Sequence, residues 1–126
     1  MDEMNISLRR APDEGKDPRD PAFQAELGQF SRRLHIAGLK VSQRGMAFDS
    51  VEHLGYPLPE FTVAFVSGAS TVIGAALGAW LKGRYGRKAR LKVGDIEAEA
   101  QTVEEVEKLL ATAQAFQARQ ELKKIR

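Results

Sequence analysis

The most informative stretch of this sequence is residues 61–81, FTVAFVSGASTVIGAALGAWL, which contain no charged residue. On a helical wheel, small residues fall on one side and large apolar residues on the other. The small side consists of Ala64, Ser67, Thr71, Gly74 and Gly78. The large side consists of Phe65, Val66, Val72, Ile73, Leu77 and Trp80. Because neither side is polar, we predict a single helix over residues 61–81 that is enclosed all round.

Three environments could enclose such a helix. The first is the middle of a helix layer on a sheet. The second is a protein interface with a second copy or a partner, formed by Ala64, Ser67, Thr71, Gly74 and Gly78 with Trp80 as an anchor at the rim. The third is a membrane, because a helix of about 31 Å matches a hydrocarbon core of about 30 Å. Few large apolar residues would gain from insertion, which weighs against the third environment.

The amino-terminal part of the chain predicts a strand, a helix and a second strand. Residues 4–9 alternate between apolar and polar side chains, as a half-buried strand does. Residues 10–20 are rich in proline and charge, and we expect a mobile loop. Asp20 and Pro21 start an amphipathic helix that Gly38 ends. Residues 39–43 alternate again, which favours a right-handed crossover between two parallel strands.

Residues 89–100 predict a β-hairpin around the turn Gly94-Asp95. If Val93 faces Ile96, one face of the hairpin is apolar and the other carries two opposite-charge pairs. These pairs are Lys92 with Glu97 and Arg90 with Glu99. After the hairpin, Thr102 and Glu105 form a capping box at the start of a last helix, whose end at residues 117–126 we expect to fray.

These elements give the order β-α-β-α-β-β-α in a single domain over residues 1–126. Residues 49–59, which include Pro57 and Pro59, are expected to be an irregular connection. Since each strand has one apolar face, we predict an α+β two-layer sandwich, with a four-stranded mixed sheet covered by helices on one face. The opposite face should be wet.

Composition excludes several classes of function. The chain has 126 residues and no cysteine, so disulfides, thiol chemistry and cysteine-based zinc sites are ruled out. A net charge of +2 does not by itself indicate a nucleic-acid partner. The first residues lack the features of a signal peptide. We therefore expect a cytoplasmic protein; the alternative is an inner-membrane protein whose carboxyl-terminal part is cytoplasmic.

No catalytic, cofactor or metal site is predicted. The two histidines, His35 and His53, have no spaced ligand or nucleophile partner. The motif Gly83-Arg84-Tyr85-Gly86 has the G-x-x-G form that clamps nucleic-acid backbones, but a helix end and a turn explain it as well. A basic patch formed by Lys82, Arg84, Arg87 and Lys88 leaves weak nucleic-acid backbone binding as an alternative function.

The assembled pattern resembles the effector-associated constant component family, first type, a group of small proteins from bacterial conflict and signalling gene clusters. The resemblance covers residues 4 to about 116. It rests on the Gly/Ala-rich helix ending in Ala79-Trp80-Leu81-Lys82, the basic strand, the Gly-Asp hairpin and the segment TVEEVEKLL at residues 102–110. It implies a non-enzymatic interaction or adaptor module that links effectors to their partners. A single-pass membrane component remains the alternative.

Overall fold

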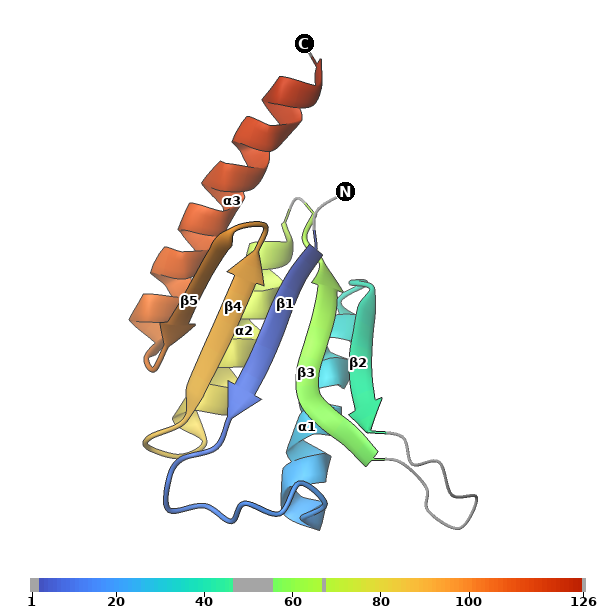
Figure 1. The fold of residues 1–126 in the computed structure, drawn as a ribbon, viewed down its shortest axis with the longest axis vertical. Helices are drawn as coiled ribbons and strands as arrows, with labels where there is room; N and C mark the ends of the chain where they lie inside the picture. Colours follow the sequence, from blue (N-terminus) through green and yellow to red (C-terminus); the bar gives the residue numbers. More distant parts are fainter. Residues whose placement is uncertain (1–2, 47–55, 67, 126) are drawn as a thin grey trace.

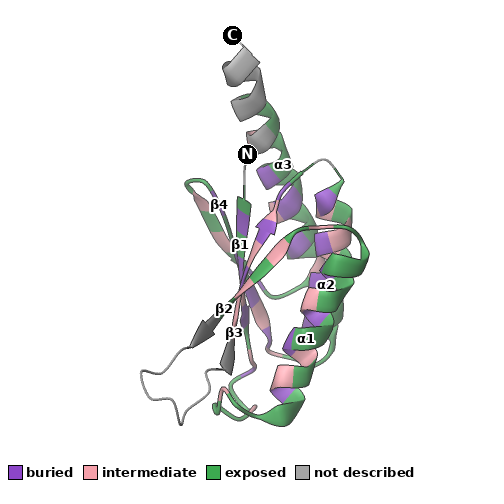
Figure 2. Cartoon of the chain, turned by 90° about the vertical axis from the view of Figure 1, so that its right-hand side faces the viewer, coloured by how far each residue is buried: buried purple, intermediate pink, exposed green. Residues whose placement is uncertain are grey.

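The computed structural model describes residues 3–46, 56–66 and 68–125, which form one five-stranded sheet and three helices (Figure 1). In chain order the elements are β1 (Glu3–Arg9), α1 (Pro21–Ile36), β2 (Val41–Met46), β3 (Tyr56–Ala64), α2 (Ala69–Lys82), β4 (Lys88–Val93), β5 (Ile96–Ala100) and α3 (Val103–Ile125). The strand order is β2-β3-β1-β4-β5, and every neighbouring pair is antiparallel. The helices lie on one side of the sheet (Figures 1 and 2). The α+β class is thus confirmed.

The predicted helix over residues 61–81 is wrong in its first part. Residues 61–64 belong to β3, and α2 starts only at Ala69, after Gly68 with a φ of +84°. Phe61, Val63 and Phe65 are all buried, so this segment follows the two-residue period of a strand. Over so few apolar residues, the periods of helix and strand are hard to separate.

Strand β3 also replaces part of the irregular connection expected at residues 49–59, of which residues 49–55 lie outside the described residues. Pro57 pairs with Gly45 of β2, whereas the pairing of β3 with β1 begins only at Glu60. The start of β3 is therefore paired with β2 on one side and is not paired with β1 on the other. Proline is tolerated at such an edge, because its missing N–H group would have no partner strand there. This additional strand makes the sheet five-stranded and antiparallel instead of four-stranded and mixed.

The two strands that flank α1 run in parallel directions, as expected, but they are not paired with each other. β1 and β2 are both antiparallel to β3, so they run in the same direction. However, β3 lies between them in the sheet. β1 instead occupies the centre, paired with β3 on one side and β4 on the other.

The predictions from local sequence signals are confirmed. The hairpin has the expected register, with Val93 opposite Ile96, and Gly94 has a φ of +58°. The Asp20 side chain accepts a hydrogen bond from the Phe23 amide at the start of α1. Thr102 Oγ1 accepts one from the Glu105 amide at 3.1 Å, as a capping box requires. The backbone of α3 is helical to Ile125, and the fraying of its end stays a prediction.

The core lies between the sheet and the helix layer, as the burial colours of Figure 2 show. In β1, Met4, Ile6 and Leu8 face this core, while alternate residues face away from the helices. β4 follows the same alternation. The sheet therefore has one covered face and one face open to solvent, which we call the open face.

Candidate interaction surfaces

The small residues of α2 are partly used for packing within the chain. A Cβ atom added at Gly74 would lie 3.3 Å from Leu110 Cδ1, and one added at Gly78 would lie 3.6 Å from Val103 Cγ2. Leu110 and Val103 both belong to α3. The absence of a side chain at Gly74 thus lets α3 approach α2 closely, whereas a Cβ atom at Gly78 would make an ordinary van der Waals contact. This is the burial within a helix layer that the sequence allowed as its first environment.

The other predicted interface residues are dispersed. Ala64 lies in β3, opposite Glu3, and not on α2. Trp80 is only 4% exposed, so its prediction as an anchor at the rim is wrong. Thr71 is exposed on α2, whereas Ser67 lies outside the described residues. Of the predicted residues that the structure describes, Thr71, Gly74 and Gly78 share one surface.

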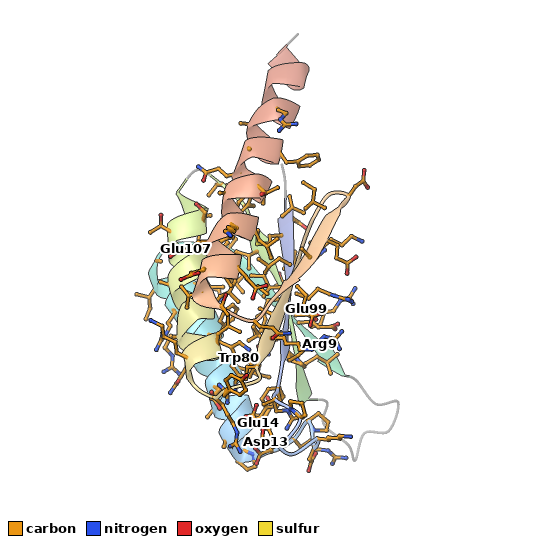
Figure 3. All side chains as sticks on the ribbon, turned by 90° about the vertical axis from the view of Figure 1, so that its left-hand side faces the viewer. Arg9, Asp13, Glu14, Trp80, Glu99 and Glu107 are labelled. Atoms are coloured by element: carbon orange, nitrogen blue, oxygen red, sulfur yellow. The ribbon has the colours of Figure 1, made fainter. Side chains whose placement is uncertain are left out.

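That surface is a groove between α2 and α3 with a volume of about 710 Å³. We call it the α2–α3 groove. Its lining is mostly small or apolar and consists of Ser70, Thr71, Gly74, Ala75, Gly78, Ala79, Lys82, Val103, Glu107, Leu110, Ala111 and Gln114. Ala75, Ala79 and Ala111 are exposed in it. Glu107 marks its α3 side in Figure 3.

The membrane alternative started from a helix of 21 residues, but α2 has 14. Among the described residues, no helix combines the length and the apolar character needed to cross a bilayer.

The predicted basic patch does not form, because its central member is buried. Arg87 is 4% exposed and contacts two carboxylates. It donates to Glu26 at 2.7 and 2.8 Å and to Glu14 at 2.9 and 3.2 Å. It also donates to the Trp80 carbonyl oxygen at 3.1 Å. Together these five hydrogen bonds occupy all five N–H donors of the guanidinium.

This Arg87 cluster (Arg87, Glu14, Glu26 and Trp80) joins the turn between α2 and β4, which holds Arg87, to three other parts of the chain. Glu14 comes from the loop after β1, Glu26 from α1 and Trp80 from α2, and Figure 3 shows Glu14 near Trp80. The Trp80 ring stacks under the guanidinium, with Arg87 Cζ 3.9 Å from the ring centroid. A Cβ atom at Gly83 would lie 2.6 Å from Arg87 Nη1, so glycine is needed there to make room.

The hydrogen bonds of the Arg87 cluster favour the charged forms of Glu14 and Arg87. Hydrogen bonding from Arg87 holds the pKa of Glu14 below its ordinary value of 4.5. Burial would lower the pKa of Arg87, but the hydrogen bonds to Glu14 and Glu26 outweigh burial and raise it. Glu14 lies in the loop that was expected to be mobile, and the cluster anchors this part of it.

Two further members of the predicted patch also meet carboxylates. Arg84 lies 3.1 Å from Asp13, and its hydrogen bond lowers the pKa of that exposed carboxyl. Lys88 lies 3.5 Å from Glu99. With Gly86 at a φ of +96°, the G-x-x-G motif is a helix end and a turn. The structure therefore brings these cations to separate carboxylates and does not gather them into one basic surface.

A second concave surface, which sequence reasoning did not identify, lies on the open face. It is a hollow of about 260 Å³ lined by Asn5, Ile6, Ser7, Arg9, Arg44, Glu60, Phe61, Thr62, Arg90, Lys92 and Glu97. The small polar side chains belong to the central strands, and the long charged ones surround them. The alternation of polar residues along the strands indicates that these side chains face solvent. The strand order is needed to show which of them lie side by side and form the hollow.

Of the two histidines, the one that the structure describes, His35, does not line either surface. His35 is exposed on α1, and His53 lies outside the described residues. Within residues 3–46, 56–66 and 68–125, no three potential metal-ligating side chains come together.

No protein-family model, curated protein or solved structure matches this chain. Its function has to be inferred from its surfaces.

Proposed function

We propose that this chain is a non-enzymatic protein–protein interaction module, an adaptor that holds a helix of a protein partner in the α2–α3 groove. The resemblance to the effector-associated constant component family supports the proposal that the module acts in a bacterial effector or conflict system. Under this proposal the module works in the cytoplasm and uses no cofactor.

The observation that carries this proposal is the groove itself. Two adjacent helices present exposed alanines at Ala75, Ala79 and Ala111 over a floor that includes Gly74 and Gly78. Small side chains allow a third helix to approach to the usual interaxial distance of about 8–10 Å. Lys82 and Glu107 lie in the lining with opposite charges, which favours one orientation of the incoming helix.

The test is co-purification with the products of adjacent genes, because an adaptor of an effector system is expected to be encoded beside its partners. We expect wild-type protein to form a complex that is measurable by size-exclusion chromatography with light scattering. The variant A75E/A79E should lose it, because two carboxylates would then fill the groove. Glutamate has nearly the helix propensity of alanine, so the fold should persist.

The matched control is A22E/A25E, which places the same two residues on exposed positions of α1. It should bind as the wild type does, and circular dichroism should give the same helix content for all three proteins. If A75E/A79E retains the complex, the groove is not the interface. If the complex is a homo-oligomer whose mass rises with concentration, the occupant is a second copy.

Gly74 and Gly78 are unsuitable positions for this test. Leucine at either glycine would collide with α3, so loss of binding would reflect damage to the helix layer. The exposed alanines change the surface without changing the core.

A further inference from the structure

The open face carries a regular arrangement of side chains that the strand registers define. Along one row across the sheet lie Ser42, Thr62, Asn5, Lys92 and Glu97. The next row holds Glu60, Ser7, Arg90 and Glu99. The short side chains of Asn5, Ser7 and Thr62 therefore lie together on β1 and β3, and the longer charged side chains of Glu60, Arg90 and Lys92 lie beside them. This difference in side-chain length produces the hollow.

The hollow has a neutral floor that can hydrogen-bond. Asn5, Ser7 and Thr62 supply amide and hydroxyl groups, and the Thr62 hydroxyl donates to Asn5 Oδ1 at 3.0 Å. Such groups can bind the backbone N–H and C=O groups of a peptide. They do not select for charge, so selectivity has to come from the walls.

The walls carry more positive than negative charge. Four cations (Arg9, Arg44, Arg90 and Lys92) line the hollow with two carboxylates (Glu60 and Glu97). In the described part of the chain, Arg9 and Lys92 have no carboxylate within ion-pair distance. The other two cations are paired loosely, Arg44 with Glu60 at 3.9 Å, and Arg90 with Glu97 at 3.5 Å and with Glu99 at 3.9 Å. These distances exceed those of a well-formed charge-assisted hydrogen bond.

The charge pattern also indicates the class of ligand. A nucleic acid presents phosphates at every nucleotide, and Glu60 and Glu97 would repel them. Among the described residues that line the hollow, none is a tyrosine or tryptophan, and the phenylalanine, Phe61, is only 2% exposed, so none of them can stack with bases. A peptide with separated carboxylates can instead place each one beside a cation and its backbone over the polar floor.

We infer that the open face is a second binding site, which takes an acidic peptide segment of a protein partner. The ligand's carboxylates meet Arg9 and Lys92 and compete with Glu60 and Glu97 for Arg44 and Arg90. The site lies on the side of the sheet opposite the helix layer, as Arg9 and Glu99 show in Figure 3. It therefore does not depend on the α2–α3 groove.

The experiment measures fluorescence anisotropy of a short labelled peptide in which Glu alternates with Ser. We expect saturable binding that weakens between about 50 and 150 mM salt, because the contacts are exposed. A peptide with Gln in place of Glu should not bind. The variant R9Q/K92Q should bind the Glu peptide about tenfold more weakly, since it loses two cationic contacts.

Two further variants make the test specific. R32Q/K108Q removes the same charges from exposed positions of α1 and α3, and it should bind as the wild type does. E60Q/E97Q should bind more tightly, by about threefold, because it removes the competing carboxylates. This gain cannot come from a misfolded protein.

Three results would overturn the inference. One is no binding of the Glu peptide by the wild type. Another is equal binding by wild type and R9Q/K92Q. The third is tighter binding of a labelled oligothymidylate than of the Glu peptide, which would make the site a nucleic-acid site. None of these results tests the proposal that the α2–α3 groove binds a helix of a partner.

Discussion

The Arg87 cluster and the open face use the same chemistry, arginine beside glutamate, in two different ways. Arg87 is buried, and its hydrogen bonds to Glu14 and Glu26 measure 2.7 to 3.2 Å. Arg90 on the open face is about half exposed and lies 3.5 and 3.9 Å from Glu97 and Glu99. Every N–H donor of Arg87 is occupied, whereas Arg90 lies near two carboxylates without forming a short hydrogen bond to either.

The difference separates residues that hold the fold from residues that are available to a ligand. A buried ion pair with satisfied donors fixes the elements that contribute to it, because removing one partner leaves an uncompensated charge. Exposed pairs at longer distance contribute little to stability, so a ligand can replace one carboxylate by another at small cost. The sequence places both kinds in a single basic run, residues 82–92, where they look alike.

The largest effect is expected for R87L. Leucine removes every contact of the guanidinium and leaves Glu14 and Glu26 facing each other without a cation. We expect the free energy of unfolding to fall by about 3 kcal/mol, at the lower end of the range for broken buried pairs because Glu26 is partly exposed. Urea denaturation followed by circular dichroism measures it. A loss below about 1 kcal/mol would place Arg87 in the same class as Arg90.

A smaller effect with a defined pH dependence is expected for E14Q. At neutral pH this variant should lose about 1.5–3 kcal/mol, the range for a hydrogen bond to a charged group. Because the folded pKa of Glu14 is lowered from 4.5, its contribution is complete above that value and is lost as pH falls through the folded pKa. The stability gap between wild type and E14Q should therefore narrow on acidification below about pH 4.5. A gap that stays constant from pH 7 to pH 3 contradicts this assignment.

The smallest effect is expected for R90Q on the open face. Exposed pairs contribute about 0–1 kcal/mol, so the unfolding midpoint in urea should hardly move. The residual difference should shrink further when salt is raised to about 1 M, where the Debye length is about 3 Å. A loss comparable to that of R87L would remove the distinction between the two arginines and show that the open face is structural.

The parts of this fold that the sequence predicted are those with local causes. The hairpin register depends on two turn residues and on the alternation of residues 89–100, which all lie within one short segment. The caps at Asp20 and Thr102 likewise depend on residues three positions apart. Such signals act before any tertiary contact forms, so they can be identified without knowing the fold.

The parts that the sequence missed depend on distant partners. Glu14 and Glu26 lie 73 and 61 residues from Arg87, and nothing in the basic run indicates that one member is buried with them. β3 was missed because its prolines are typical of loops and its apolar residues also fit a helix. Its pairing with β1 shows why the strand forms, and that pairing joins residues more than 50 positions apart. The hollow on the open face exists only once the strand order is known.

The central position of β1 has a consequence for how the chain is made. This strand is synthesised first among the five, but its neighbours are β3 and β4, and β4 ends at Val93. At about 5–20 residues per second, the strand waits about 4–17 s on the ribosome before its second neighbour exists. During that interval β3 is the single neighbour in the folded sheet that β1 can pair with. A nascent chain that ends before β4 therefore cannot form the central part of this sheet, because one of the two neighbours of β1 does not yet exist.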